Sequence, residues 1–247
     1  MEASLTATDE SFPDRLARVR LQIEEACARA GRHSDEVQLL GVTKKKDPDC
    51  IEEASQCGLW CFGESRVQEA RQKIAICSSS LEWHLIGHLQ GNKVRDAAEL
   101  FHTIHSIDSE KLMRLLNDAC ETAGKTMSIY VQVNLAGEAS KSGLSPDAVE
   151  SALTVAMQCH RLDVIGLMTI PPFTPEPEDS RPYFEQLRML SAGLATRSGL
   201  HLSGLSMGMS HDFSYAIEEG STCVRIGTAL FGGRRTRTQE LEAGGKE

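Results

Sequence analysis

The sequence lacks the features that mark secreted, membrane-spanning and nucleic-acid-binding proteins. It has no Cys-x-x-Cys pair: its 8 cysteines are scattered, and Cys57 and Cys61 are one residue too far apart for that redox motif. No apolar stretch approaches the ~18 residues of a membrane span. The formal net charge of -9 disfavours a surface for nucleic acid or anionic membranes. We therefore expect a soluble protein that binds neither.

A targeting signal is also missing from the first ten residues. The segment MEASLTATDE contains acids and no apolar core, whereas a signal peptide needs such a core and a transit peptide is rich in arginine. Scattered cysteines without a signal peptide are expected to be reduced thiols, as in the cytoplasm. These observations predict a cytoplasmic protein.

Short apolar runs alternate with helical patterns along the chain, whose 247 residues suit one α/β barrel. A helix is expected from Ser11 to Gly31. Strands are expected at residues 37–43, 60–63, 83–87, 103–107, 128–135, 164–170, 201–206 and 222–226. This alternation predicts a parallel sheet closed into a (β/α)8 TIM barrel with one extra N-terminal helix. A doubly wound open sheet is the alternative, because periodicity cannot show closure.

The domain organisation is expected to be simple. No linker interrupts the pattern, so residues 1–247 are predicted to form one domain with its core at about 11–234. The polar segment 235–247 is expected to be a flexible tail. Five of the 8 prolines lie in residues 171–182, which are expected to form an exposed loop.

Lys44 directly follows the first expected strand, at the end of a barrel where active residues lie. A lysine partly shielded from water there has a lowered pKa, and its amine can attack an aldehyde. The alternative is that Lys44, Lys45 and Lys46 form a solvated basic loop, because lysines are usually exposed. Spacing alone favours this alternative.

Glycines and hydroxyl groups follow the seventh and eighth expected strands, where barrels commonly bind phosphate. Gly208 and Gly227 would let backbone N–H groups approach an anion closely. Ser206 and Thr228 would add hydroxyl donors. The glycines could equally serve tight turns.

Eight segments together resemble the pyridoxal 5′-phosphate (PLP) homeostasis protein family of the YggS/PROSC type. They occur in the family's order, cover roughly residues 39–234, and read LLGVTK, FGESRVQEA, EWHLIGHLQGNKV, IHSIDSEKL, VQVNLAGEASKSGL, IGLMTIPP, RPYFEQLR and LSMGMSHDFSYAIEEGSTCVRIGTALFGGR. The last segment is the most specific. The resemblance implies a fold-type III PLP-binding barrel, similar to the N-terminal domain of alanine racemase.

The resemblance also implies a set of cofactor-binding residues. Lys44 would form the Schiff base with PLP, and Arg225 would face the pyridine nitrogen. An arginine cannot give its proton to that nitrogen, so the ring would stay neutral and be a poorer electron sink. The phosphate would meet Ser206, the backbone near Met207, Gly227 and Thr228.

Three positions depart from the family pattern. The family's asparagine near the cofactor ring is Ser65 here, so a contact there would depend on one hydroxyl. The family's SKTKP corresponds to residues 43–47, in which Lys46 could be an accessory PLP acceptor or simply a loop charge. Gly91 stands where the family has the serine of LQSNK.

No metal site is expected from the sequence. The four histidines of the central segments would be partly buried residues lining the barrel mouth: His84, His88, His102 and His105. A zinc site would need a third ligand, and no cysteine or acid offers one at suitable spacing.

The family resemblance implies a protein that carries and buffers PLP and releases it to apo-enzymes during transient contacts. The alternative is a PLP-dependent amino-acid racemase. Alanine racemases take a second acid/base from a C-terminal domain, whereas 14 residues (234–247) follow Gly233 here. We therefore expect a non-catalytic monomer. A barrel that binds another phosphate ligand is a third interpretation.

Overall fold

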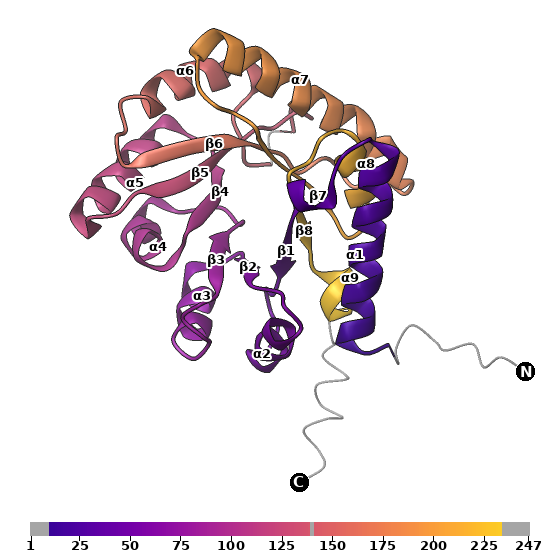
Figure 1. Ribbon diagram of the computed structural model, residues 1–247. Helices are drawn as coiled ribbons and strands as arrows, with labels where there is room; N and C mark the ends of the chain where they lie inside the picture. Colours follow the sequence, from indigo (N-terminus) through magenta and orange to yellow (C-terminus); the bar gives the residue numbers. More distant parts are fainter. Residues whose placement is uncertain (1–9, 139–140, 234–247) are drawn as a thin grey trace, which may run out of the picture.

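The structure is a computed structural model that describes residues 10–138 and 141–233 (Figure 1). Its strands form one closed parallel barrel, in which each strand pairs with the next along the chain. The strands are β1 (Gln38–Val42), β2 (Cys61–Glu64), β3 (Glu82–Leu85), β4 (Thr103–Ile107), β5 (Met127–Gln132), β6 (Leu162–Met168), β7 (Gly204–Met209) and β8 (Cys223–Ile226).

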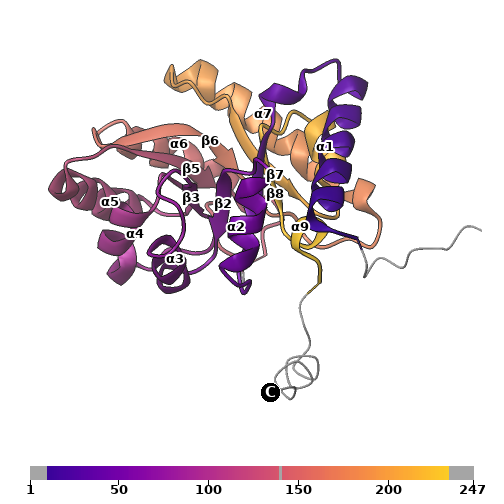
Figure 2. The same ribbon diagram turned by 60° about the horizontal axis from the view of Figure 1, so that its bottom comes forward.

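Helices surround the strands on the outside, as Figures 1 and 2 show from two directions. They are α1 (Phe12–Arg29), α2 (Asp49–Gln56), α3 (Val67–Ile74), α4 (Val94–Leu100), α5 (Glu110–Ala123), α6 (Pro146–Ala156), α7 (Arg181–Ser198), α8 (Phe213–Glu218) and α9 (Thr228–Phe231). Within the described residues, no helix combines the length and apolarity that crossing a membrane requires.

The pairing of the first and last strands closes the barrel. Leu40 of β1 lies opposite Arg225 of β8, and Gly41 lies opposite Ile226. The predicted TIM barrel is therefore confirmed, and the open doubly wound alternative is wrong. The expected tail at 235–247 lies outside the described residues.

The extra helix α1 packs against the end of the barrel chain. Ser11 caps it by accepting a hydrogen bond from the Asp14 N–H. The rings of Phe12 and Phe231 stack with centroids 5.4 Å apart, and the Arg15 Nε donates to the Leu230 carbonyl over 2.6 Å. Helix α1 therefore fixes the short helix α9 that follows β8.

Two predicted boundaries are wrong in ways that affect the site. The strand expected at 60–63 runs from Cys61 to Glu64, so Glu64 still belongs to β2. The strand expected at 201–206 runs from Gly204 to Met209. Ser206 is therefore a residue within the strand and does not belong to the loop after it.

The barrel interior is more polar than the core outside it. Apolar side chains such as Phe62, Trp83 and Ile104 fill the space between strands and helices. A row of polar side chains instead crosses the inside of the barrel, each at most 3% exposed: His84, His105, Ser206 and Arg225. Barrel interiors are usually filled by branched aliphatic side chains, so these residues need a specific explanation.

Candidate functional site at the carboxyl end of the barrel

The loop after β1 and the segment after β8 meet at the carboxyl end of the barrel. Lys46 joins them, because its Nζ donates to the carbonyl oxygens of Phe231 and Gly232 over 2.6 and 3.2 Å. Lys44 lies in the same loop and is exposed. Among the described residues, no hydrogen bond or ion pair engages the Lys44 side chain. Its amine is therefore available at the barrel mouth.

A buried lysine fixes the backbone on both sides of Lys44. The Nζ of Lys73, a residue only 5% exposed, donates to the Thr43 carbonyl and to one oxygen each of Glu64 and Glu69, all over 2.7 Å. Glu69 in turn accepts the N–H of Lys45, whose φ of 60° is uncommon for a residue other than glycine. Thr43 adds a 2.7 Å bond from its hydroxyl to Glu64.

The two carboxylates of this cluster have opposite pKa shifts. Burial raises the pKa of Glu64, although Lys73 and Thr43 act against it. Burial would also raise the pKa of Glu69, but hydrogen bonds from Lys73 and the Lys45 N–H outweigh it and leave the pKa below its ordinary value. Glu69 therefore stays ionised and keeps its hold on the loop.

Backbone N–H groups converge at the turn after β8. The N–H groups of Gly227 and Ala229 both donate to the Ser210 hydroxyl over 3.2 Å. Such convergent N–H groups are the donors that proteins use to bind phosphate. Thr228 lies between them in the sequence and is exposed. Our sequence reasoning missed Ser210, although it ends the SMGMS segment and directly follows β7.

The other residues expected at the phosphate lie deeper. Ser206 is fully buried inside the barrel, and its hydroxyl is bonded to His105 and Arg225. Met207 is fully buried in the outer core. Gly208 has a φ of 93°, and a Cβ there would lie 2.6 Å from the Cβ of Ala216. Gly208 is therefore required for the packing of α8 on β7.

Arg225 lies inside the barrel, one residue before the end of β8. Its NH1 donates to the Ser206 hydroxyl over 2.6 Å, and its NH2 donates to the Thr169 carbonyl over 2.9 Å. A guanidinium has five N–H donors, and these two bonds use two of them. The two bonds hold Arg225 in one orientation.

A chain of hydrogen bonds runs from Arg225 to the opposite end of the barrel interior. Ser206 Oγ lies 2.7 Å from His105 Nδ1, and His105 Nε2 lies 2.9 Å from His84 Nδ1. His84 Nε2 then lies 2.9 Å from Glu82 Oε1. If both rings are neutral, the direction of donation is the same along the whole chain. Arg225 can only donate and the Glu82 carboxylate can only accept, so each group in between accepts from the Arg225 side and donates toward Glu82.

Stability should decrease as the pH falls from about 6.5 to about 5. Burial, followed by the proximity of His84 and Arg225, holds the pKa of His105 well below its ordinary value. The folded protein therefore keeps this ring neutral while the unfolded chain takes up a proton, which costs up to ~1.4 kcal/mol per pH unit. Urea unfolding at several pH values measures this slope. We expect a flatter slope for His105→Gln, and equal slopes would contradict the assignment.

Comparison with known proteins agrees with this geometry. The sequence model described as alanine racemase, N-terminal domain, matches residues 16–235. A pyridoxal phosphate homeostasis protein of Aquifex aeolicus is 43% identical over 223 residues, which are 90% of this chain and 98% of that protein. A protein of the same name from Escherichia coli is 41% identical and is covered to 95%. The chain belongs to the pyridoxal phosphate homeostasis protein family.

Two solved structures have the same barrel fold. PipY of Synechococcus elongatus, in a structure with PLP bound, matches with a TM-score of 0.80 and 36% identity, over 90% of this chain and 100% of that one. An alanine racemase of Clostridium difficile matches with a TM-score of 0.68 at 15% identity, over 89% of this chain and 57% of the racemase. The second match shows a shared barrel fold.

Two departures from the family pattern can now be placed. Ser65 follows β2 and lines a cavity of about 590 Å³ together with His88 and Lys93. Its backbone contacts the next strand end so closely that a Cβ on Gly87 would lie 2.2 Å from the Ser65 oxygen. The Lys46 ammonium donates to the carbonyl oxygens of Phe231 and Gly232 and so links the loop after β1 to the segment after β8.

The expectations for the histidines are largely wrong. His84 and His105 are buried inside the barrel, and His102 is exposed just before β4, at the end opposite the mouth. His88 alone among the four is exposed near the mouth, where it bonds to Asp108. The sequence spacing offered no third ligand for a zinc site, but the fold brings the ligand atoms of Cys61, Glu82 and His84 within 4.8 Å of one another.

Proposed function

We propose that this protein binds PLP at the carboxyl end of its barrel and holds it for delivery to PLP-dependent enzymes, without catalysing a reaction itself. The observation that supports the proposal is that the loop containing Lys44 meets the turn after β8: Lys46 of this loop donates to the Phe231 carbonyl, and the N–H groups of Gly227 and Ala229 converge on Ser210 in that turn. The full-length match to relatives named for PLP homeostasis supports the same role.

The residues present fit this cofactor. Lys44 would hold its aldehyde covalently as a Schiff base, and the turn from Gly227 to Ala229 with Ser210 would bind its phosphate. Arg225 is held by Ser206 and Thr169 with N–H donors to spare, which suits the pyridine nitrogen. PLP itself supplies a reactive aldehyde and an electron-accepting ring. A permanently protonated arginine would keep that ring unprotonated and so limit its use in catalysis.

The setting of this function is also part of the proposal. We infer that the protein works in the cytoplasm as a monomer and meets apo-enzymes transiently. The exposure of Lys44 supports the transient contact, because a recipient could then reach the cofactor directly. The backbone near Met207 would contact the phosphate, and the Ser65 hydroxyl would contact the cofactor ring. Lys46 would hold the loop that contains Lys44 or serve as an accessory acceptor of PLP.

Ser210→Ala should weaken PLP binding by about 10–100-fold, because a hydrogen bond to a charged group contributes about 1.5–3 kcal/mol. Equilibrium dialysis against PLP measures this effect. Ser203→Ala is the matched control, since Ser203 is an exposed serine that precedes β7. Equal affinity in the two variants would remove Ser210 from the phosphate site.

The absence of catalysis has its own test. The PLP-loaded protein is incubated with single L-amino acids, and the D-isomer is measured over time. We expect no turnover above the rate of free PLP. Sustained formation of a D-amino acid would favour the racemase alternative.

A further inference from the structure

Three side chains able to bind a metal meet inside the barrel at its amino-terminal end, away from the PLP site. Cys61 is the first residue of β2, Glu82 is the first residue of β3, and the two strands pair with these residues opposite each other. His84 comes two residues after Glu82 and therefore faces the same side. Its Nε2 lies 3.5 Å from Cys61 Sγ and 2.9 Å from Glu82 Oε1.

We propose that Cys61, Glu82 and His84 bind a divalent metal ion of the Zn²⁺ class. Sulfur, imidazole nitrogen and carboxylate oxygen are the three ligand types that zinc takes from proteins. A thiolate in the set disfavours Mg²⁺ and Ca²⁺, which prefer oxygen ligands. Three protein ligands leave the fourth tetrahedral position for water.

The present spacing is close to that of a tetrahedral site. With Zn–S of about 2.3 Å and Zn–N of about 2.05 Å, sulfur and nitrogen ligands lie ~3.5 Å apart. This is the observed distance between Cys61 Sγ and His84 Nε2. The nitrogen–oxygen separation of a site would be ~3.4 Å, so the Glu82 carboxylate needs to move by only about half an ångström from its 2.9 Å hydrogen bond.

The charges of the site balance in the buried environment. Cys61 and His84 are 1% and 2% exposed, so an uncompensated charge there would be costly. On binding, the metal displaces the Cys61 thiol proton to solvent, and a Zn–S bond forms. A dication with one thiolate, one carboxylate and one neutral imidazole has no net charge.

The metal would replace the hydrogen bond between His84 Nε2 and Glu82, while the bonds from His84 to His105 and from His105 to Ser206 are kept with reversed direction. When a metal takes the lone pair of His84 Nε2, the proton of this ring must lie on Nδ1, which then donates to His105 Nε2. His105 in turn carries its proton on Nδ1 and donates to the Ser206 hydroxyl, which has two acceptor lone pairs. The number of protons on the two rings is unchanged. A metal-binding histidine usually has its second nitrogen fixed in this way.

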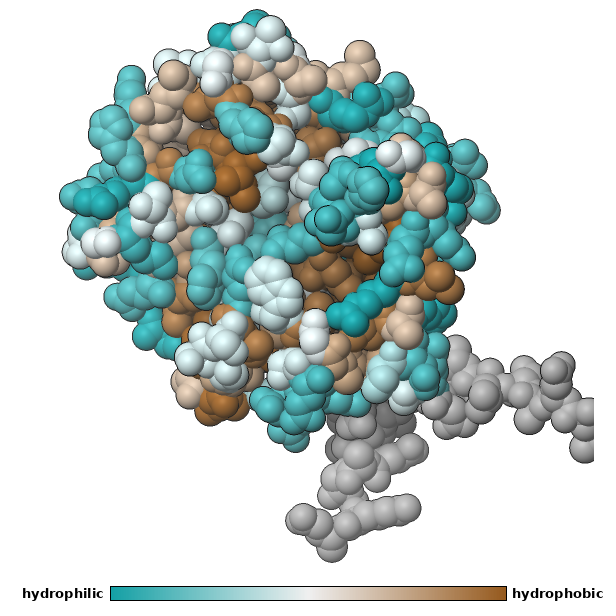
Figure 3. All heavy atoms as spheres, viewed as in Figure 1, coloured by the Kyte–Doolittle hydropathy of each residue, from teal (hydrophilic) through white to brown (hydrophobic). Residues whose placement is uncertain are grey.

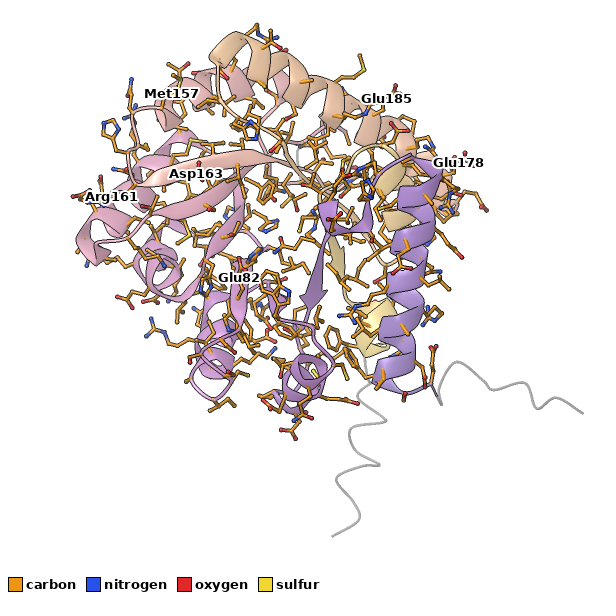
Figure 4. All side chains as sticks on the ribbon, in the orientation of Figure 1. Glu82, Met157, Arg161, Asp163, Glu178 and Glu185 are labelled. Atoms are coloured by element: carbon orange, nitrogen blue, oxygen red, sulfur yellow. The ribbon has the colours of Figure 1, made fainter. Side chains whose placement is uncertain are left out.

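An ion can reach the cluster from solvent. Glu82, labelled in Figure 4 at β3, has a side chain that is 29% exposed. Gln38, whose Nε2 donates to Cys61 Sγ over 3.4 Å, also lines a cavity of about 510 Å³. Figure 3 shows an apolar hollow between β1 and α1, and the cavity lies there, lined by Ile23, Leu39 and Leu59.

The test is titration of reduced, metal-free, full-length protein with Co²⁺ in the absence of PLP. We expect one equivalent to bind and to produce a thiolate-to-cobalt charge-transfer band, which added Zn²⁺ then removes. Because no PLP is present, this result is independent of the proposed carrier function.

Variants locate the site. Cys61→Ala should remove the charge-transfer band and weaken Zn²⁺ binding by more than the 10–100-fold that is typical of residues outside the ligand set. Cys57→Ala is the control, because Cys57 is also a thiol but lies at the end of α2. Glu82→Gln at the solvent end provides a second test should the Cys61 variant fold poorly, and it should weaken binding at least tenfold.

Two results would overturn the proposal. One is a cobalt spectrum without a thiolate band. The other is a band that persists in both Cys61→Ala and Glu82→Gln, since zinc or cobalt would then be held by other cysteines.

Discussion

Lys44→Ala should reduce to background the amount of PLP that borohydride traps on the protein. The proposed covalent link needs the amine at this position, and the neighbouring lysines are poorly placed to replace it. The Lys46 ammonium is already bonded to the carbonyls of Phe231 and Gly232. Lys45 has a left-handed backbone conformation, with φ of 60°, which directs its side chain differently from that of Lys44. Pyridoxyl incorporation after reduction, measured from intact protein mass, gives the result.

Lys45→Ala is the matched control for this experiment, because it removes an adjacent exposed lysine and retains Lys44. It should incorporate one pyridoxyl group, as the unmodified protein does. Full incorporation into Lys44→Ala would contradict the assignment. Incorporation that moved to Lys46 would instead identify that residue as the accessory acceptor considered from the sequence.

Lys73→Met should destabilise the protein by about 3–5 kcal/mol, the usual cost of removing one partner of a buried ion pair. The substitution leaves Glu64 either charged without its cation or protonated, and Glu64 is fully buried. It also removes the bond to the Thr43 carbonyl. Urea unfolding measures the loss.

The same substitution should slow PLP capture under conditions in which the variant is still folded. Thr43 and Lys45 flank Lys44, and the Lys73–Glu69 pair holds both backbone positions. A purely structural role would change stability without changing this rate. Lys111→Met, at an exposed position of α5, should change stability by less than about 0.5 kcal/mol. Equal unfolding curves for the Lys73 and Lys111 variants would contradict the role of the cluster.

Most of the fold could be predicted because each strand is a short apolar run bounded by polar residues. The run before Lys44 and the run at Thr103–Ile107 were placed to within about one residue. Periodicity alone could not distinguish the predicted closed barrel from an open sheet, because closure depends on the pairing of β1 with β8 across the whole chain. The pattern of apolar residues locates each strand but does not show which strands pair.

The boundary of β7 was misplaced for a local reason. Leu202 and Leu205 suggested a strand over 201–206, but the alternation that matters is between Ser206, which faces the interior, and Met207, which faces the outer core. The shift moved Ser206 from the end of the expected strand to a position within β7. It also brought Ser210 to the end of β7, where it meets the N–H groups of Gly227 and Ala229.

The hydrogen-bonded chain from Arg225 to Glu82 inside the barrel could not be predicted from the sequence. His84 and His105 lie on different strands, and their contact depends on how β3 and β4 are staggered. The same holds for Cys61 and Glu82, which are 21 residues apart and become neighbours when β2 pairs with β3. Contacts that are assembled across strands in this way could not be predicted from the sequence.

The central claim is that the amine of Lys44 holds PLP at the end of the barrel. The most direct measurement is peptide mapping by mass spectrometry after the protein is saturated with PLP and reduced with borohydride. We predict one pyridoxyl group, on the peptide that contains Lys44. A protein that gains no pyridoxyl group with PLP in excess, or gains it on a lysine away from this loop, would contradict the claim.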